Sequence, residues 1–105
     1  MTGDQRRILY YLEKAGPAYA KKLAEVLRKD WRAVEEDLTA LDGEGLIERV
    51  PGSTITYSAG KRGKVTKHMN HTYYRPTRHG RLTVRRMKTP PEVDLTPPWK
   101  RAGKG

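Results

Sequence analysis

Apolar residues in the first part of the chain recur at helical spacing in three successive segments. In each segment they share one face of a helix, because residues three or four positions apart lie above one another. These faces consist of Ile8, Leu9 and Leu12, then Leu23, Ala24 and Leu27, then Val34, Leu38 and Leu41. The pattern predicts three helices, at Asp4–Ala15, Ala18–Leu27 and Trp31–Asp42, with Gly16-Pro17 ending the first.

The second and third predicted helices carry the end signals of a helix-turn-helix. Asp30 is placed to accept hydrogen bonds from the free amides that open the third helix, and the acids of Glu35–Asp37 lie near its positive end. Gly45 suits the left-handed conformation that closes a helix, with Leu46 packing back onto it. The third helix is therefore predicted to have the setting of one that enters a DNA major groove.

The residues that follow predict a β-hairpin. Its predicted segments are Leu46–Val50, Thr54–Ser58, a turn at Gly60–Gly63 and one returning strand at Val65–Arg75. Thr54–Ser58 has the β-branched and aromatic composition of extended structure. Pro76 ends the pairing because proline has no amide to donate. The hairpin is longer than a typical wing.

These motifs resemble those of a known family. LAEVL, DWRAVEEDLTALDGEG and LIERV follow one another as in the small winged-helix transcriptional regulators of bacteria and archaea, such as the MarR and ArsR groups. HTYYRPTRHGRLTVRR resembles the returning wing strand and final helix of the same regulators. The resemblance implies an α+β winged helix-turn-helix fold, with a three-helix core, a long β-hairpin wing and a C-terminal helix.

The C-terminal helix is predicted at Arg78–Lys88, capped by Thr77, as the resemblance implies. The local pattern also suits a strand, because Leu82–Val84 alternates and includes β-branched residues. Residues 89–105 are rich in Pro, Gly and charge, which predicts a basic tail without a core of its own. The predicted domains are therefore a winged helix at 1–88 and a tail at 89–105.

Composition excludes several classes of protein. A chain of 105 residues suits one modest core, and the absence of cysteine excludes disulfides and thiol catalysis. No apolar run approaches the roughly 20 residues that span a bilayer, and the N-terminus lacks a signal-peptide core. A cytoplasmic protein is expected.

The net charge of +10 is unevenly distributed. Residues 1–50 contain 9 Lys/Arg against 10 Asp/Glu, whereas residues 51–105 contain 13 against 2. No acid occurs between Pro51 and Lys88. A polyanion is the predicted partner, because each neutralised phosphate releases condensed counterions, while a solvated basic face is the plainer interpretation.

Helix geometry selects the residues predicted to face DNA. With Val34, Leu38 and Leu41 inward, Arg32, Glu36 and Thr39 point outward. Arg32 can bind two guanine acceptors, Glu36 can accept from a cytosine amino group, and Thr39 can touch a base edge or methyl. Glu35 and Glu36 also repel phosphates. Trp31 either covers the core or stands exposed to stack on a sugar or a partner. The full predicted DNA-binding set is Lys21, Lys22, Arg28, Lys29, Trp31, Arg32, Glu36, Thr39, Lys61, Arg62, Lys64, Lys67 and Arg75.

The histidines and tyrosines predict structural roles. His68 and His71 fall at an odd spacing in a predicted strand, which points them to opposite faces and argues against a metal site. Tyr10, Tyr11 and Tyr19 are predicted to pack in the core or a dimer, and of Tyr73 and Tyr74 one is predicted to pack inward. No catalytic constellation is present in the sequence, so we expect neither an enzyme nor a cofactor.

The sequence predicts a regulator that binds double-stranded DNA. The resemblance implies a homodimer, with the first helix and Arg78–Lys88 as its interface and half-sites about one helical turn apart. An RNA-binding or ribosome-associated winged helix is the leading alternative, because it suits a basic wing beside an acidic third helix. A module that binds a protein through Glu35, Glu36 and Trp31 is a third.

Overall fold

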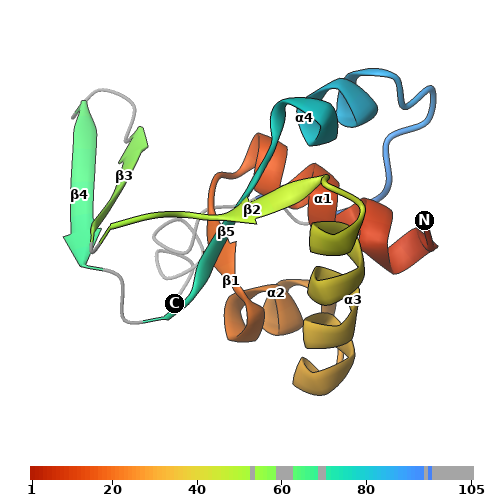
Figure 1. The fold of residues 1–105 in the computed structure, drawn as a ribbon, viewed down its shortest axis with the longest axis horizontal. Coiled ribbons are helices and arrows are strands. Elements are labelled where there is room, and N and C mark those ends of the chain that lie inside the picture. The colour runs from red at the N-terminus through yellow and green to blue at the C-terminus, as the bar shows by residue number, and fades with distance from the viewer. Residues whose placement is uncertain (53, 59–62, 69–70, 94, 96–105) are drawn as a thin grey trace, which may run out of the picture.

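The computed structural model has an α+β fold (Figure 1). It describes residues 1–52, 54–58, 63–68, 71–93 and 95. The helices in these residues are α1 (Gly3–Lys14), α2 (Ala20–Leu27), α3 (Trp31–Gly43) and α4 (Arg78–Arg85). The strands are β1 (Ala18–Tyr19), β2 (Ile47–Arg49), β3 (Thr54–Ser58), β4 (Lys64–His68) and β5 (Tyr73–Pro76).

The described strands form two antiparallel sheets. One sheet has the order β1-β5-β2 and packs against the helices, while β3 and β4 form a separate hairpin. Figure 1 shows this hairpin standing away from the helical body. The side chains buried most completely lie between α1, α2, α3 and β2, and they are Ile8, Leu9, Leu12, Leu23, Val34, Leu41 and Ile47.

The first helix agrees with the apolar pattern and begins with a capping box. The Thr2 hydroxyl accepts a hydrogen bond from the Gln5 amide, and the Gln5 side chain accepts one from the Thr2 amide, both at 3.2 Å. This exchange satisfies two amides that lack a partner within the helix. Ile8, Leu9 and Leu12 are buried, as predicted.

The second predicted helix begins two residues too early. Ala18 and Tyr19 form β1, in which they pair with Tyr74 and Tyr73 of β5. The sequence pattern missed this strand because its backbone partners lie more than fifty residues further along the chain. The helix then runs over Ala20–Leu27 with Leu23 buried.

The turn between α2 and α3 differs in detail from the prediction. Arg28 ends α2 in the left-handed conformation, with φ 53° and ψ 52°, although it is not a glycine. Asp30 occupies the N-cap position of α3, but its side chain accepts no hydrogen bond from the first turn of that helix. The Lys29 amide donates to the Ala24 carbonyl at 3.0 Å, which satisfies one end of α2.

The end of α3 confirms the glycine stop. Gly45 has φ +73°, a conformation that suits glycine because it has no Cβ. The Leu46 amide donates to the Leu41 carbonyl at 3.0 Å, and the Leu46 side chain is buried. The chain therefore leaves α3 sharply and enters β2.

The predicted returning strand is interrupted. Val65–Arg75 was expected as one strand, but β4 pairs with β3 whereas β5 pairs with β1 and β2. β4 and β5 belong to different sheets because β4 lies beside β3 alone, whereas β5 lies between β1 and β2. The predicted turn at Gly60–Gly63 lies outside the described residues except for Gly63, which has φ +79°.

The C-terminal helix is confirmed but is shorter than predicted, since α4 ends at Arg85. Thr77 caps it by accepting a hydrogen bond from the Gly80 amide at 3.1 Å. Its hydroxyl also donates to the Gly45 carbonyl at 2.6 Å, which joins α4 to the end of α3. Gly80 packs so closely there that a Cβ would collide with the Leu46 carbonyl oxygen.

The beginning of the predicted tail lies against the body. The Arg6 guanidinium donates to the Thr89 carbonyl at 3.4 Å, and the Arg7 guanidinium donates to the Glu92 carbonyl at 3.2 Å. Val93 packs on the core cluster. Residues 89–93 therefore return across α1, which the polar composition of this segment did not predict.

Candidate nucleic-acid interface

A cleft of about 370 Å³ separates the outward side of α3 from the three-stranded sheet. We call it the α3 cleft. Its lining combines aromatic, cationic and hydroxyl side chains, and the lining residues are Tyr19, Ala20, Lys21, Trp31, Glu35, Leu38, Thr39, Arg49, His71, Thr72 and Tyr74. These residues come from four separate parts of the sequence, so only the fold brings them together.

The α3 side of the cleft shares only Thr39 with the outward face predicted from the sequence. Glu35 and Thr39 are exposed and line the cleft, and buried Leu38 lies between them in sequence. The Thr39 hydroxyl donates to the Glu35 carbonyl at 3.0 Å and keeps its lone pairs available as acceptors. Arg32 and Glu36 are also exposed, as predicted, but neither lines the cleft.

The sheet side of the cleft carries Arg49, which the sequence analysis did not select. Arg49 pairs with Tyr74 across the sheet, so both side chains lie on the same face. Glu48 pairs with Arg75, and these two side chains lie on the opposite face, where Arg75 Nε and Glu48 Oε2 are 2.7 Å apart. Arg75, a predicted DNA contact, is therefore paired and does not line the cleft, whereas Arg49 does.

Aromatic rings form the mouth of the cleft. Tyr19 and His71 are stacked with ring centroids 4.1 Å apart and planes 13° apart. Trp31 is 43% exposed, so the interpretation that it covers the core is wrong, and the Lys21 ammonium lies 6.0 Å from its ring centroid. Flat exposed rings next to cations can stack on a base or a sugar.

The tyrosine predictions are met in part. Tyr11 is buried and Tyr10 is partly buried against the core. Tyr19 instead lies at the cleft, because it belongs to β1 rather than to a helix. Tyr73 is 6% exposed and contacts the Tyr19 ring edge-on at 5.1 Å, while Tyr74 packs partly against the core.

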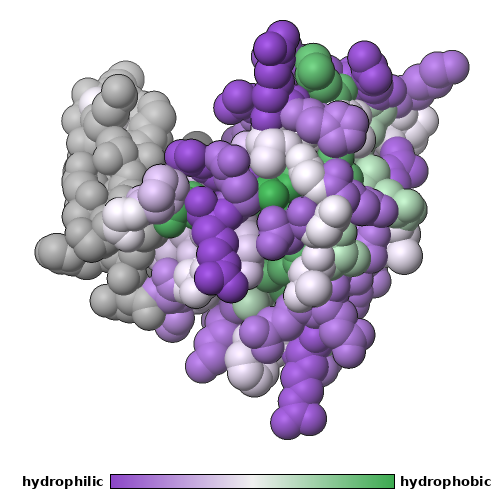
Figure 2. All heavy atoms as spheres, in the orientation of Figure 1, coloured by the Kyte–Doolittle hydropathy of each residue, from purple (hydrophilic) through white to green (hydrophobic). Residues whose placement is uncertain are grey.

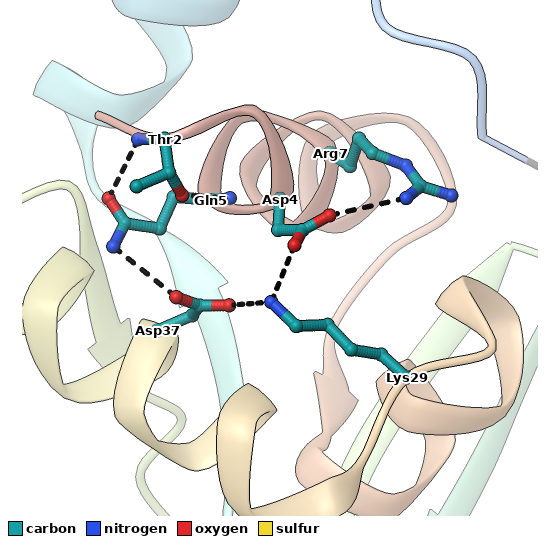
Figure 3. A network of polar contacts seen from close by, with 6 residues as sticks. All are labelled: Thr2, Asp4, Gln5, Arg7, Lys29 and Asp37. Atoms are coloured by element: carbon teal, nitrogen blue, oxygen red, sulfur yellow. Dashed lines mark hydrogen bonds and ion pairs between the residues drawn. The ribbon is translucent and has the colours of Figure 1, made fainter.

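Lys29 is used inside the protein instead of facing a phosphate. Its ammonium lies 2.7 Å from Asp4 Oδ2 and 2.6 Å from Asp37 Oδ2 (Figure 3). The Gln5 side chain donates to the other Asp37 oxygen at 3.3 Å, and Arg7 lies 3.3 Å from Asp4. The network joins α1, the turn after α2, and α3, so it fixes the orientation of these three helices relative to one another.

The network shifts the pKa values of two of its members. The hydrogen bond from Lys29 lowers the pKa of the Asp4 carboxyl, against a smaller opposing effect of burial. Burial by itself would lower the pKa of Lys29, but hydrogen bonds to Asp37 and Asp4 outweigh it and raise that pKa. Both groups are therefore held in their charged forms near neutral pH.

The remaining predicted contacts are dispersed. Lys21 is exposed at the cleft, and Lys22 is partly buried on the same helix. Arg28 is exposed but lines a different groove, together with Val93. Lys61 and Arg62 lie outside the described residues. The backbones of Lys64 and Lys67 lie in β4, but their side chains are not described.

A metal site and a membrane span each require particular features of the described residues. Within those residues, no group of three or more His, Cys, Asp and Glu side chains is placed to hold a metal ion. No helix among them is long and apolar enough to cross a bilayer. The α3 cleft combines solvent access with polar and aromatic groups.

Comparison with known proteins assigns the chain to a protein family. The family described as "Uncharacterized protein conserved in archaea" (DUF2250) matches residues 2–87, which include α1 to α4 and every residue of the α3 cleft. The chain belongs to this archaeal family. The family match ends before the segment that returns across α1. Comparisons with curated proteins and with solved structures found no match.

Proposed function

We propose that this protein is a winged-helix protein that binds double-stranded DNA and regulates transcription. The observation that carries the proposal is the α3 cleft. There, exposed side chains of α3, the second helix of the proposed helix-turn-helix, lie beside Arg49 and Lys21. A groove-binding helix needs cations next to it, because phosphates flank the base edges that it reads. The α3 cleft supplies these cations from α2 and from β2.

The first turn of α3 offers a further phosphate contact. It contains no acidic residue, because the acids of Glu35–Asp37, which the sequence predicted near this end, lie beyond the first turn. The Asp30 side chain forms no cap hydrogen bond with the free amides. Such amides and the positive end of the helix attract an anion. Arg32 is exposed at the same end of α3 and would contact base edges. Lys21 and Arg49 would neutralise phosphates of the DNA backbone.

The hairpin β3–β4 acts as the wing in this proposal. It extends from the edge of the body that carries the α3 cleft, since β2 leads into β3 and β4 leads into β5. Basic residues 61, 62, 64 and 67 lie in or next to it in the sequence. A cationic hairpin tip fits the narrow minor groove of A·T-rich DNA.

Titration with nucleic acids across a salt series tests the proposal. We expect tighter binding to duplex DNA than to single-stranded DNA of the same sequence, with affinity that falls as salt rises. Replacing Trp99 with Phe leaves Trp31 as the single tryptophan, so bound DNA should change its fluorescence. An unchanged Trp31 signal at saturation would place the binding surface elsewhere.

A matched pair of arginines in one sheet identifies the binding surface. Arg49→Gln should weaken duplex binding about 5- to 20-fold and lower the salt slope by about one, because one phosphate contact is lost. Arg75→Gln removes the same charge from the opposite face and should change the affinity less than about 2-fold, since Arg75 is paired with Glu48. Equal losses from both variants would contradict the assignment of the α3 cleft.

Single-stranded RNA is a second candidate ligand, which the aromatic mouth of the cleft favours. The stacked Tyr19 and His71 rings and the exposed Trp31 resemble a platform on which unpaired bases stack. Glu35 and Glu36 also suit unpaired bases better than closely spaced duplex phosphates. If a single-stranded RNA competes for the protein better than the duplex in the same titration, this candidate replaces the first.

A further inference from the structure

The last helix and the residues after it carry a concentration of positive charge away from the α3 cleft. Arg78–Lys88 contains five Lys/Arg and no acid. All five cations are exposed, and they are Arg78, Arg81, Arg85, Arg86 and Lys88. We call this set the α4 cationic face. Figure 2 shows hydrophilic side chains around the end of the molecule that α4 forms.

Three of these cations, Arg78, Arg81 and Arg85, stand on a fixed helix, and Arg86 and Lys88 follow its last turn. Thr77 ties the start of α4 to the Gly45 carbonyl, Val84 is buried in the core cluster, and Met87 packs on it. Arg78, Arg81 and Arg85 follow an i, i+3, i+7 spacing, so they form a stripe about 10 Å long on one side of the helix. A fixed stripe loses less conformational entropy on binding than a disordered basic tail would.

The described residues of the protein do not neutralise this face. Lys29, Arg7 and Arg75 each form an ion pair with a carboxylate elsewhere in the molecule. By contrast, no carboxylate of the described residues forms an ion pair with any member of the α4 cationic face. Five neighbouring charges of one sign repel one another, and an external polyanion relieves that repulsion.

The same charges argue against α4 as a self-association surface. A two-fold axis that passes through this face would place it against its own copy, so it would meet a second set of five cations. Like charges placed opposite each other destabilise an interface. The charge therefore disfavours a dimer contact centred on Arg78–Lys88 and favours a contact with an acidic partner.

The position of α4 separates its partner from the duplex at the α3 cleft. α4 packs on α1 and β5, and Figure 1 shows α4 and the first turn of α3 at opposite ends of the body. We propose that the α4 cationic face binds the phosphate backbone of a second duplex, so that one protein molecule bridges two DNA segments. The bridging rests on the proposed function for the first duplex, but the α4 contact does not.

A two-colour capture experiment tests bridging. One duplex is fixed to beads, and a second, fluorescent duplex is added with the full-length protein at low salt. We expect the wild-type protein to capture the second duplex. The variant Arg81→Gln, Arg85→Gln, Arg86→Gln should lower this capture at least 10-fold while keeping affinity for a single duplex within about 5-fold, because the α3 cleft is intact.

Two further variants separate charge from folding and from the first site. Replacing the same three arginines with Lys keeps the charge and should retain capture, whereas loss of capture would overturn a purely electrostatic contact. The variant Lys21→Gln, Arg49→Gln should also lose capture because the first duplex is held less firmly. If that variant captures normally while the α4 variant does not, the proposed function fails and the α4 contact stands.

Sedimentation velocity decides between bridging and dimerisation. The wild-type protein and the α4 variant should sediment alike in the absence of DNA. A dimer that dissociates in the α4 variant would overturn the proposal, because two α3 clefts in one dimer would then explain capture. Undiminished capture by the variant with three glutamines in the α4 cationic face would overturn the proposal directly. Displacement of the second duplex by RNA at lower concentrations than by duplex DNA would also overturn it.

Discussion

Lys29 Nζ lies 2.6 Å from Asp37 Oδ2, and this contact ties the turn between α2 and α3 to the middle of α3. The same ammonium reaches Asp4 at 2.7 Å, so α1 is held by the same side chain. A cation that the sequence suggested for phosphate binding thus orients the helix proposed to read DNA.

Replacing Lys29 with Met should lower the free energy of unfolding by about 1–3 kcal/mol, because charge-assisted hydrogen bonds to two carboxylates are lost. Urea unfolding followed by circular dichroism measures the change. Lys88→Met is the control, since Lys88 is exposed and unpaired among the described residues, and it should change stability by less than about 0.5 kcal/mol. Similar losses in both variants would show that the network contributes little.

The contribution of the network should depend on pH at both ends of the range. The pKa of Asp4 is lowered by folding, so its contribution is present above the ordinary carboxyl range and disappears as pH falls through the folded-state pKa. The pKa of Lys29 is raised, so its contribution is present below the ordinary lysine value and disappears as pH rises through the folded-state pKa. The stability difference between wild type and Lys29→Met should therefore be flat from about pH 5 to 10 and narrow outside that window. A difference that grows below pH 4 would have the wrong sign.

Gly80→Ala should destabilise the protein by about 1–3 kcal/mol or more, because the added Cβ meets the Leu46 carbonyl where α4 packs on the end of α3. Gly43→Ala is the matched control, since open space surrounds that position within α3. The control should be neutral or stabilising by up to about 1 kcal/mol. The midpoint temperature of thermal unfolding should therefore fall for Gly80→Ala and stay unchanged or rise for Gly43→Ala.

Arg28→Gly should raise the free energy of unfolding by about 0.5–1 kcal/mol. The left-handed backbone costs a non-glycine residue roughly 1–2 kcal/mol, which exceeds the extra entropy that glycine loses on folding. Arg32→Gly makes the same change at an exposed position in the first turn of α3 and should lower stability by up to about 1 kcal/mol. Chemical denaturation of both variants measures this contrast, and a loss at both positions would refute the strain at Arg28.

Arg32→Ala should relax the sequence preference of DNA binding, whereas Lys21→Ala should weaken binding to all duplexes alike. A base-reading arginine discriminates by about 1–3 kcal/mol, but a phosphate contact carries no sequence information. Enrichment of sequences from a pool of random duplexes, carried out with each variant, measures the difference. An unchanged preference in Arg32→Ala would remove α3 from the role of reader.

The local elements were largely predictable because their signals lie close together in the sequence. The α1 and α3 faces, the Gly45 stop and the Thr77 cap each depend on residues within one or two helical turns. The acid-free run after Pro51 was also visible without coordinates. The predicted outward face of α3 is confirmed as exposed, since helix geometry fixes it once the buried side is known.

The assembly of the candidate site was not predictable in the same way. Ala18 and Tyr19 have no local reason to form a strand, and they do so because β5 supplies their backbone partners. Arg49 and Arg75 are both arginines near the β3–β4 hairpin, and only the pairing register assigns them to opposite faces. No sequence signal distinguished Lys29 from the other lysines, because its carboxylate partners lie 25 and 8 residues away.

The sequence by itself determined which segments form helices, where they stop and how charge divides between the two halves, since each depends on short-range geometry or on composition. The tertiary structure decided which cations are free to bind a ligand, which rings meet around the α3 cleft and where α4 presents its charge. These features depend on contacts between residues far apart in the chain, and packing of the core selects those contacts.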